Sequence, residues 1–213
     1  MFHVKHSDIE PEPSAAVKLC GDALPTLRHF AEHLGQWGEE LGLVGPRELD
    51  RLWTRHILNS ALVAHKLGSG TLIDIGSGAG FPGLVIAAMR PDLRCVLIEP
   101  LGRRAHWLRD EAQRLGLSNV EVRNERAEEA AGHVVADFVT ARAVSALKTL
   151  VPLAAPLLKP GGELVLMKGQ KVEEEVRAAA PVLVKWRVSD PAIEITGPEF
   201  DTEETRIFRA TVG

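Results

Sequence analysis

The chain has 213 residues, 45% of them hydrophobic, and a mean hydropathy near zero, which suits one globular domain with a substantial core. No apolar run approaches the roughly 20 residues of a membrane-spanning helix, so we expect no membrane partner. The net charge is −4, but residues 190–205 hold six acids and no Lys or Arg. The remainder is slightly basic, so nucleic-acid binding is not excluded.

The first third of the chain is expected to be helical. Residues 1–13 carry two prolines and little apolar content, which predicts a loose start, and they lack the apolar stretch of a secretion signal. Residues 14–68 place apolar side chains at three- and four-residue spacing, which indicates helices, with a break at Gly42, Gly45 and Pro46. We expect a single domain: this helical extension followed by a core over residues 69–213.

Two pairs of potential metal or redox residues give no site. Cys20 and Cys95 lie far apart, so we expect reduced thiols and a cytoplasmic protein. His29 and His33 share a helix face at metal-ligand spacing, but no third ligand is near them in the sequence. We therefore expect no metal cofactor.

A glycine-rich loop is the most informative motif. A predicted buried strand over residues 71–75 is followed by Gly76, Gly78 and Gly80 at alternate positions, and Pro82 suits the first turn of a helix. Backbone without side chains lets a ligand approach closely. The pattern predicts a loop that binds a nucleotide-type cofactor.

Two cofactors fit this loop, and a purely structural glycine turn is a third interpretation. Gly78, Gly80 and Gly83 match the dinucleotide fingerprint, which seats a pyrophosphate at a helix N-terminus. Asp74 favours S-adenosylmethionine (SAM), because a carboxylate suits the ammonium of its methionine part and is a poor neighbour for a pyrophosphate. Glu99, at the end of the next apolar segment, fits the ribose diol of either cofactor.

After residue 70, strands and helices alternate, which predicts a parallel sheet with helices on both faces. The expected strands are 71–75, 94–99, 120–123, 137–141 and 162–168, and the expected helices are 82–89, 102–116 and 146–158. Residues 172–177 predict a short helix. The apolar runs 182–188 and 205–212 predict a terminal antiparallel hairpin.

A second motif separates the two cofactors. Pro160-Gly161-Gly162 ends a helix and turns directly into a strand, which is typical of class I SAM-dependent methyltransferases, whereas NAD enzymes need no such turn. Together with Asp74 and Glu99 it favours SAM. We therefore expect a Rossmann-like class I methyltransferase fold of the α/β class.

Six ordered motifs resemble the RsmG (GidB) family of 16S ribosomal RNA guanine-N7 methyltransferases, which act on the 530 loop of the small subunit. They are Arg55–Ser60, Asp74–Gly83, Leu101–Arg104, Arg126–Glu129, Ala141–Ala143 and Leu166–Gly169. The resemblance spans about Leu43 to Lys171, with departures at Asn59, where the family usually has Asp, and at Gly42, where it has Asn. It implies this activity, SAM as cofactor with S-adenosylhomocysteine as product, and 16S ribosomal RNA or the small subunit as partner. We expect a monomer.

The resemblance also implies roles for individual residues. The expected cofactor-binding residues are Asp74, Gly76, Gly78, Gly80, Phe81, Glu99, Pro100, Leu101, Ala127, Glu128 and Arg142. Arg142 is expected to position the reactants through the SAM carboxylate, guanine O6 or an RNA phosphate. The residues expected to contact RNA are Arg51, Arg55, His56, Arg103, Arg104 and Lys168.

The chemistry of guanine N7 agrees with this interpretation. N7 has an in-plane lone pair and no proton, so the enzyme needs no general base and has to align the reactants. The sequence lacks the motifs of amino-group and pyrimidine-C5 methyltransferases. The alternatives are a SAM-binding ribosome assembly factor without catalysis, or a methyltransferase for a protein or small molecule.

Overall fold

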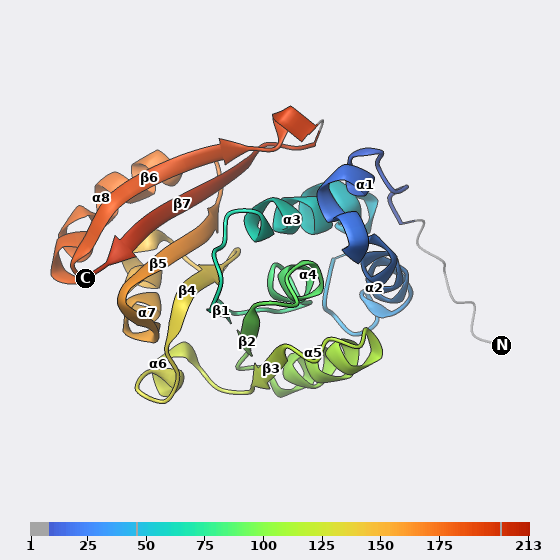
Figure 1. The fold of residues 1–213 in the computed structure, drawn as a ribbon, viewed down its shortest axis with the longest axis horizontal. Coiled ribbons are helices and arrows are strands. Elements are labelled where there is room, and N and C mark those ends of the chain that lie inside the picture. The colour runs from blue at the N-terminus through green and yellow to red at the C-terminus, as the bar shows by residue number, and fades with distance from the viewer. Residues whose placement is uncertain (1–8, 46, 201) are drawn as a thin grey trace.

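Seven strands form one sheet in the order β3-β2-β1-β4-β5-β7-β6 in the computed structural model, which describes residues 9–45, 47–200 and 202–213 (Figure 1). The strands are β1 (Thr71–Ile75), β2 (Arg94–Ile98), β3 (Val120–Arg123), β4 (Ala136–Ala141), β5 (Leu158–Lys168), β6 (Val188–Thr196) and β7 (Thr205–Val212). The first five run parallel, and β7 pairs antiparallel with both β5 and β6.

The register of the central strands sets the position of the site. Ile75 at the end of β1 pairs with Ile98 at the end of β2 and with Ala141 at the end of β4. The segments that follow these strands, which begin with Gly76, Glu99 and Arg142, therefore leave the sheet along one edge. In open α/β sheets this carboxyl edge is where ligands bind.

Helices cover both faces of the sheet (Figure 1). The helices and short helical turns are α1 (Ala15–Cys20), η1 (Gly21–Ala23), α2 (Leu24–Trp37), η2 (Leu49–Arg51), η3 (Leu52–Leu58), α3 (Asn59–Ala64), α4 (Gly83–Met89), α5 (Gly102–Arg114), α6 (Ala127–Ala130), α7 (Leu147–Ala154), η4 (Ala155–Leu157), α8 (Val172–Lys185) and η5 (Pro198–Phe200). In one apolar cluster, helices α1 through α5 pack against the sheet. In the other, α6, α7 and α8 pack against it. Within the described part of the chain, no helix has the length and apolar character to cross a membrane.

The helical extension is more irregular than its spacing predicts. The helical pattern expected up to the break at Gly42 ends earlier, at Trp37, and η3 is a single stretch of π-helix. The loose start is wrong for residues 9–13: Glu10 accepts a hydrogen bond from the Thr54 N–H at 2.9 Å, and Glu12 pairs with Arg28 at 2.6 Å. Residues 1–8 and Pro46 lie outside the described residues.

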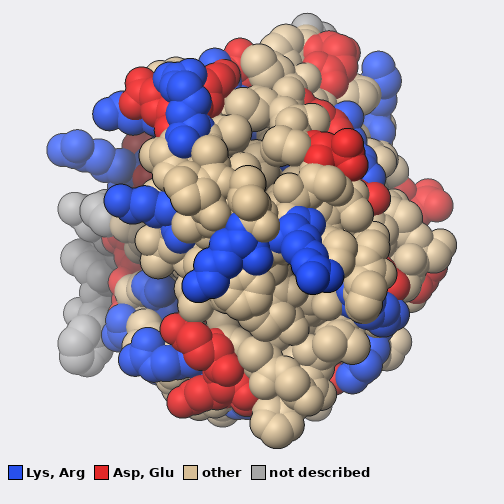
Figure 2. Space-filling model, turned by 90° about the vertical axis from the view of Figure 1, so that its left-hand side faces the viewer, with Lys and Arg blue, Asp and Glu red and all other residues tan. Residues whose placement is uncertain are grey.

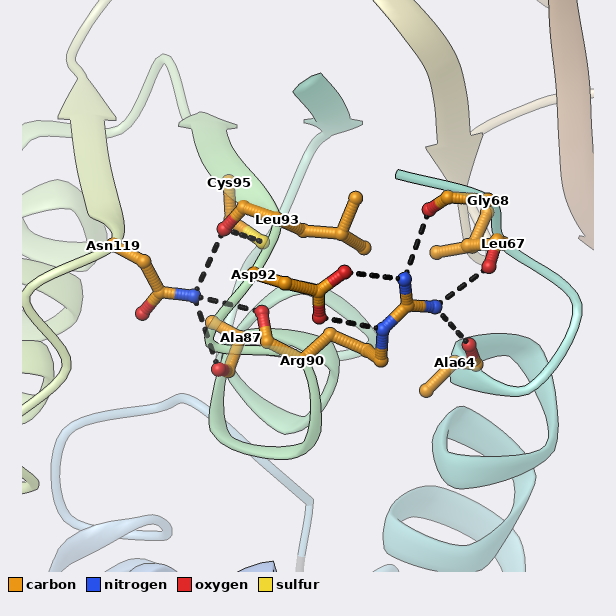
Figure 3. A network of polar contacts seen from close by, with 9 residues as sticks. All are labelled: Ala64, Leu67, Gly68, Ala87, Arg90, Asp92, Leu93, Cys95 and Asn119. Atoms are coloured by element: carbon orange, nitrogen blue, oxygen red, sulfur yellow. Dashed lines mark hydrogen bonds and ion pairs between the residues drawn. The ribbon is translucent and has the colours of Figure 1, made fainter. Parts of the chain in front are cut away.

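Arg90 ties the extension to the core, and Asn119 braces the same loop within the core (Figure 3). The Arg90 guanidinium donates hydrogen bonds to the carbonyl oxygens of Ala64, Leu67 and Gly68 at and after the end of α3 and is held by Asp92. Asn119 donates to the carbonyl oxygens of Ala87, Arg90 and Leu93, between α4 and β2. These contacts satisfy carbonyl groups that a helix end leaves without partners.

The last part of the chain departs from the expected boundaries. β5 starts at Leu158, so the Pro160–Gly162 turn is a bulge inside the strand and does not precede it: Leu158 pairs with Ala136 and Glu163 with Phe138. The helix expected over 172–177 continues through Pro181 to Lys185, and the hairpin strand is 188–196 instead of 182–188. Val172, Ala179 and Leu183 are the buried residues of α8, and this apolar face outweighs the proline, which is exposed.

Candidate functional site

The glycine loop lies at the carboxyl edge of the sheet, between β1 and α4. Gly76 N–H donates to the Ile98 carbonyl at 2.8 Å, and Gly80 N–H donates to the Ser77 carbonyl at 2.7 Å. Gly80 has a φ of +115°, and a Cβ there would lie 2.5 Å from Leu84 Cδ1. The turn therefore requires glycine at this position and presents bare backbone at the sheet edge.

Glu99 joins the loop to the end of β2. Its carboxylate accepts hydrogen bonds from Gly78 N–H at 3.0 Å and from Leu101 N–H at 2.9 Å, and the residue is 3% exposed. Asn124 donates to the carbonyls of Glu99 and Pro100 at 2.9 and 3.0 Å. Sequence reasoning missed Asn124, whose only signal is its place just after β3.

Asp74 lies beneath the loop and is fully buried. Its Oδ2 accepts a hydrogen bond from Gly83 N–H at 3.0 Å, while Oδ1 has no partner among the described residues. Burial raises the pKa of Asp74 to about 7, against smaller opposing effects of its hydrogen bonds. The carboxyl thus fixes the start of α4 and keeps one oxygen free beneath the loop.

Arg142 follows β4 and lies beside the glycine loop. Its guanidinium carbon is 5.7 Å from the centre of the Phe81 ring, within reach of a cation–π interaction. Burial, followed by the nearby Arg55, lowers the pKa of Arg142 to about 10, which leaves it cationic at neutral pH. The side chain is therefore a fixed positive charge at the sheet edge.

His56 packs beside Phe81 and is buried, so its expected contact with RNA stays a prediction that the structure does not support. It is 7% exposed, its ring centre is 5.1 Å from that of Phe81, and its Nε2 donates a hydrogen bond to Glu48 at 2.6 Å. Burial and the neighbouring Arg142 lower the pKa of His56 to about 4. The imidazole is neutral at pH 7 and packs against the Phe81 ring.

A cavity of about 470 Å³ opens next to Arg142, within the usual size of a small-ligand site. Its charged lining residues are Arg55, Arg142, Lys168, Glu175, Glu203 and Glu204. Three further lining residues carry buried oxygens without a hydrogen-bond partner among the described residues: Asn59 Oδ1, Ser145 Oγ and Thr205 Oγ1. Unpaired buried groups are unfavourable unless water or a ligand satisfies them, so they mark the cavity as a candidate ligand site.

The remaining expected cofactor residues lie on the other side of the loop. Pro100 and Leu101 are exposed after β2, with Leu101 49% exposed despite its apolar side chain. Glu128 is exposed at the start of α6, and Ala127 is buried beside it. An exposed Leu101 next to Glu99 leaves an apolar surface that an aromatic base could cover.

The expected RNA-contacting arginines are partly engaged by other groups. Arg51 pairs with Glu203 at 2.5 Å and Arg55 lies 3.6 Å from Glu48, while Arg104 donates to the Gly42 carbonyl at 3.3 Å. Arg103 is exposed on α5. These four side chains lie on η2, η3 and α5, at the rim of the extension, and remain available to phosphates that displace weak surface pairs.

Lys168 is not a free surface lysine but lines the cavity, and its expected contact with RNA stays a prediction. Its side chain is 8% exposed, donates to the Ser145 carbonyl at 2.8 Å and pairs with Glu175 at 2.7 Å. Sequence reasoning missed Glu175, Ser145 and Thr205, because their proximity depends on how α8 and β7 pack beside β5.

Figure 2 shows the face on the α8 and β6 side of the molecule. Lys and Arg side chains are scattered over its described residues, several with Asp or Glu beside them, and they form no continuous basic surface there. This face gives no support for a phosphate-binding surface.

Comparisons with known proteins agree with the geometry. A family model for rRNA small subunit methyltransferase G (GidB) matches residues 23–196. The chain is 51% identical over 208 residues to the ribosomal RNA small subunit methyltransferase G of Clavibacter sepedonicus, covering 98% of this chain and 99% of that protein. It is 52% identical over 204 residues to the protein of the same name from Leifsonia xyli subsp. xyli, covering 96% and 98%.

Solved structures share the fold. An O-methyltransferase from Bacillus cereus in complex with SAH superposes with a TM-score of 0.58 at 17% identity, covering 86% of this chain and 90% of that one. At this identity the likeness concerns the fold alone. The expected class I SAM-dependent methyltransferase fold, with its terminal antiparallel strands, is confirmed.

Proposed function

The chain belongs to the rRNA small subunit methyltransferase G family, and we propose that it transfers a methyl group from SAM to N7 of a guanine in the 530 loop of 16S ribosomal RNA. Family membership makes it a SAM-dependent methyltransferase of small-subunit ribosomal RNA. The choice of N7 and of the 530 loop is the proposal, since a fold hosts many substrates.

The residues at the sheet edge fit SAM. The bare backbone of the glycine loop admits the methionine part, which a Cβ at Gly80 would disturb through Leu84. The Glu99 carboxylate still has lone pairs for a ribose diol beside its two backbone donors. The unpartnered Oδ1 of Asp74 gives the ammonium end a carboxylate nearby.

The proposed reaction requires no proton transfer by a residue of the protein. SAM, when bound, supplies a methyl group on a positively charged sulfur, and guanine N7 offers a lone pair without a proton to remove. The protein has to hold the base in line and exclude water. His56, neutral at pH 7 and hydrogen-bonded to Glu48, then acts as support for Phe81 and not as a base.

Arg142 is the observation that carries this proposal. It lies between the Phe81 ring of the glycine loop and the cavity, where its guanidinium can donate to guanine O6 while N7 faces the loop. O6 neighbours N7 on the same edge of the base, so one donor orients the nucleophile. The family's substrate and the free, buried Cys20 and Cys95 support the proposed location in the cytoplasm, and a monomer of one domain stays a prediction.

The test is methyl transfer from radiolabelled SAM to small-subunit particles that lack this modification, and to their extracted RNA. The proposal expects label in the ribosomal RNA with the wild-type chain and a loss of at least tenfold in rate with Arg142→Ala, while SAM binding persists. SAM binding without label in RNA would support an assembly factor without catalysis. Label in ribosomal protein would support a protein methyltransferase.

A further inference from the structure

A partly buried ion pair lines the cavity. Lys168, at the end of β5, pairs with Glu175 of α8 at 2.7 Å, and the side chains are 8% and 24% exposed. Glu175 also accepts a hydrogen bond from the Leu147 N–H at 2.9 Å. Both contacts use Oε2, so two donors fix the carboxylate while Oε1 has no partner in the described part of the chain.

The order of the strands sets the distance from this pair to the glycine loop. Gly76 follows β1, Arg142 follows β4 and forms a bridge with Met167, and Lys168 follows at the end of β5. Neighbouring strands lie about 4.8 Å apart. From the loop to Glu175 the cavity floor therefore crosses two strand spacings, which is enough for one purine lying over Arg142 and Met167.

A guanine with N7 toward the loop presents its other end to α8. O6 lies on the N7 side, beside Arg142, and the 2-amino group lies at the far end of the Watson–Crick edge. The other two carboxylates of the cavity come from the hairpin and are held by arginines, Glu203 by Arg51 and Glu204 by Arg206 at 2.7 Å. Glu175 is the acceptor that the sheet geometry puts opposite the loop.

We propose that Glu175 selects guanine by accepting a hydrogen bond from its 2-amino group on Oε1, an inference that rests on the proposed function. Guanine is the one standard base with an amino group at this position. Adenine has N7 but would leave Oε1 facing a C–H group, at the cost of an unpaired carboxylate oxygen. Lys168 acts as a positioning residue, because it holds Oε2 and turns Oε1 toward the base.

The test compares guanosine with inosine, which lacks only the 2-amino group, at the target position of reconstituted small-subunit particles. For the wild-type chain we expect kcat/KM to be about 10- to 100-fold lower on inosine, the value of one hydrogen bond to a charged group. In Glu175→Gln, Lys168 and the Leu147 N–H retain the amide oxygen, so the amide NH₂ meets the 2-amino group as donor against donor. The ratio of guanosine to inosine should fall to about 1.

Two control variants carry the same change elsewhere. Glu174→Gln alters an exposed neighbour on α8 that does not line the cavity, and Glu204→Gln alters a second lining carboxylate, just before β7. Both should retain the wild-type ratio. An unchanged ratio in Glu175→Gln, or a ratio near 1 in Glu204→Gln, would overturn the proposal.

Binding of SAM shows whether a variant is folded. If Glu175→Gln fails to bind SAM, the double variant Lys168→Met/Glu175→Gln removes the unpaired buried ammonium and should give the same ratio near 1. A wild-type chain that leaves guanosine particles unlabelled would refute the proposed function itself, which is distinct from an unchanged inosine ratio in an active enzyme.

Discussion

The buried carboxyl of Asp74 should make the stability of the protein depend on pH in a direction that is unusual for an aspartate. Its Oδ2 is hydrogen-bonded to Gly83 N–H at 3.0 Å, but burial dominates and raises its pKa to about 7 from the ordinary 3.8. The folded state therefore binds this proton more tightly than the unfolded state. The resulting stabilisation is complete below about pH 4 and is lost as the pH rises through 7.

The size of the effect follows from the shift. A change of about three pKa units corresponds to about 4 kcal/mol in the free energy of unfolding. His56 acts in the opposite direction, since its lowered pKa makes the folded state resist protonation, and its contribution is lost as the pH falls from 6.5 through 4. In the pH dependence of wild-type stability the two contributions oppose each other, so neither can be read from that curve alone.

The difference in the free energy of unfolding between the wild-type chain and Asp74→Asn isolates the contribution of the Asp74 carboxyl. We expect the free energy of unfolding of the wild type, minus that of the variant, to fall by about 4 kcal/mol between pH 4 and pH 8 in urea titrations. Asp137→Asn is the control, because Lys159 lowers the pKa of that carboxyl and its difference should stay constant above pH 5. A constant difference for Asp74→Asn over the same range would refute the reasoning.

Three further changes test the cofactor loop, the link to the extension and the site. Gly80→Ala should lower the free energy of unfolding by about 1–3 kcal/mol and weaken SAM binding in calorimetry, because of its φ of +115° and the close Leu84; unchanged affinity would contradict this. Arg90→Ala removes hydrogen bonds to three carbonyls and should cost about 1–3 kcal/mol in urea unfolding, without changing SAM affinity. Arg142→Lys should reduce kcat of methyl transfer at least about tenfold, because an ammonium lacks the planar fork; a rate equal to wild type would exclude a positioning role.

The parts of the fold that depend on local sequence were predictable. The runs 71–75 and 120–123 match β1 and β3, because a short apolar run in the first and an alternation of valine with charged residues in the second each favour a strand locally. The glycine loop and Glu99 follow directly from strand ends, so the edge on which they meet was also predictable.

The boundary between α8 and β6 was not predictable from local signals. A short helix is expected over residues 172–177, yet α8 continues past Pro181 because Leu183 is buried with Ala179 in the core beside α7. A proline on an exposed face loses one backbone hydrogen bond, which packing can offset.

The ion pairs and hydrogen bonds around the site could not be predicted from the sequence either. His56 and Lys168 look like solvent-facing basic residues in the chain, and only their partners, Glu48 and Glu175, reveal them as buried supports of the site. Such contacts join segments whose proximity is decided by the assembled sheet.

The most direct test of the central claim is to map the methylated atom in small-subunit RNA after incubation with the wild-type chain and SAM. Chain cleavage at N7-methylguanine, followed by primer extension, reads both the atom and the position. The account predicts one new cleavage at a guanine of the 530 loop, absent when SAM is omitted and strongly reduced with Arg142→Lys. Methyl label in the RNA without cleavage in that loop would contradict it.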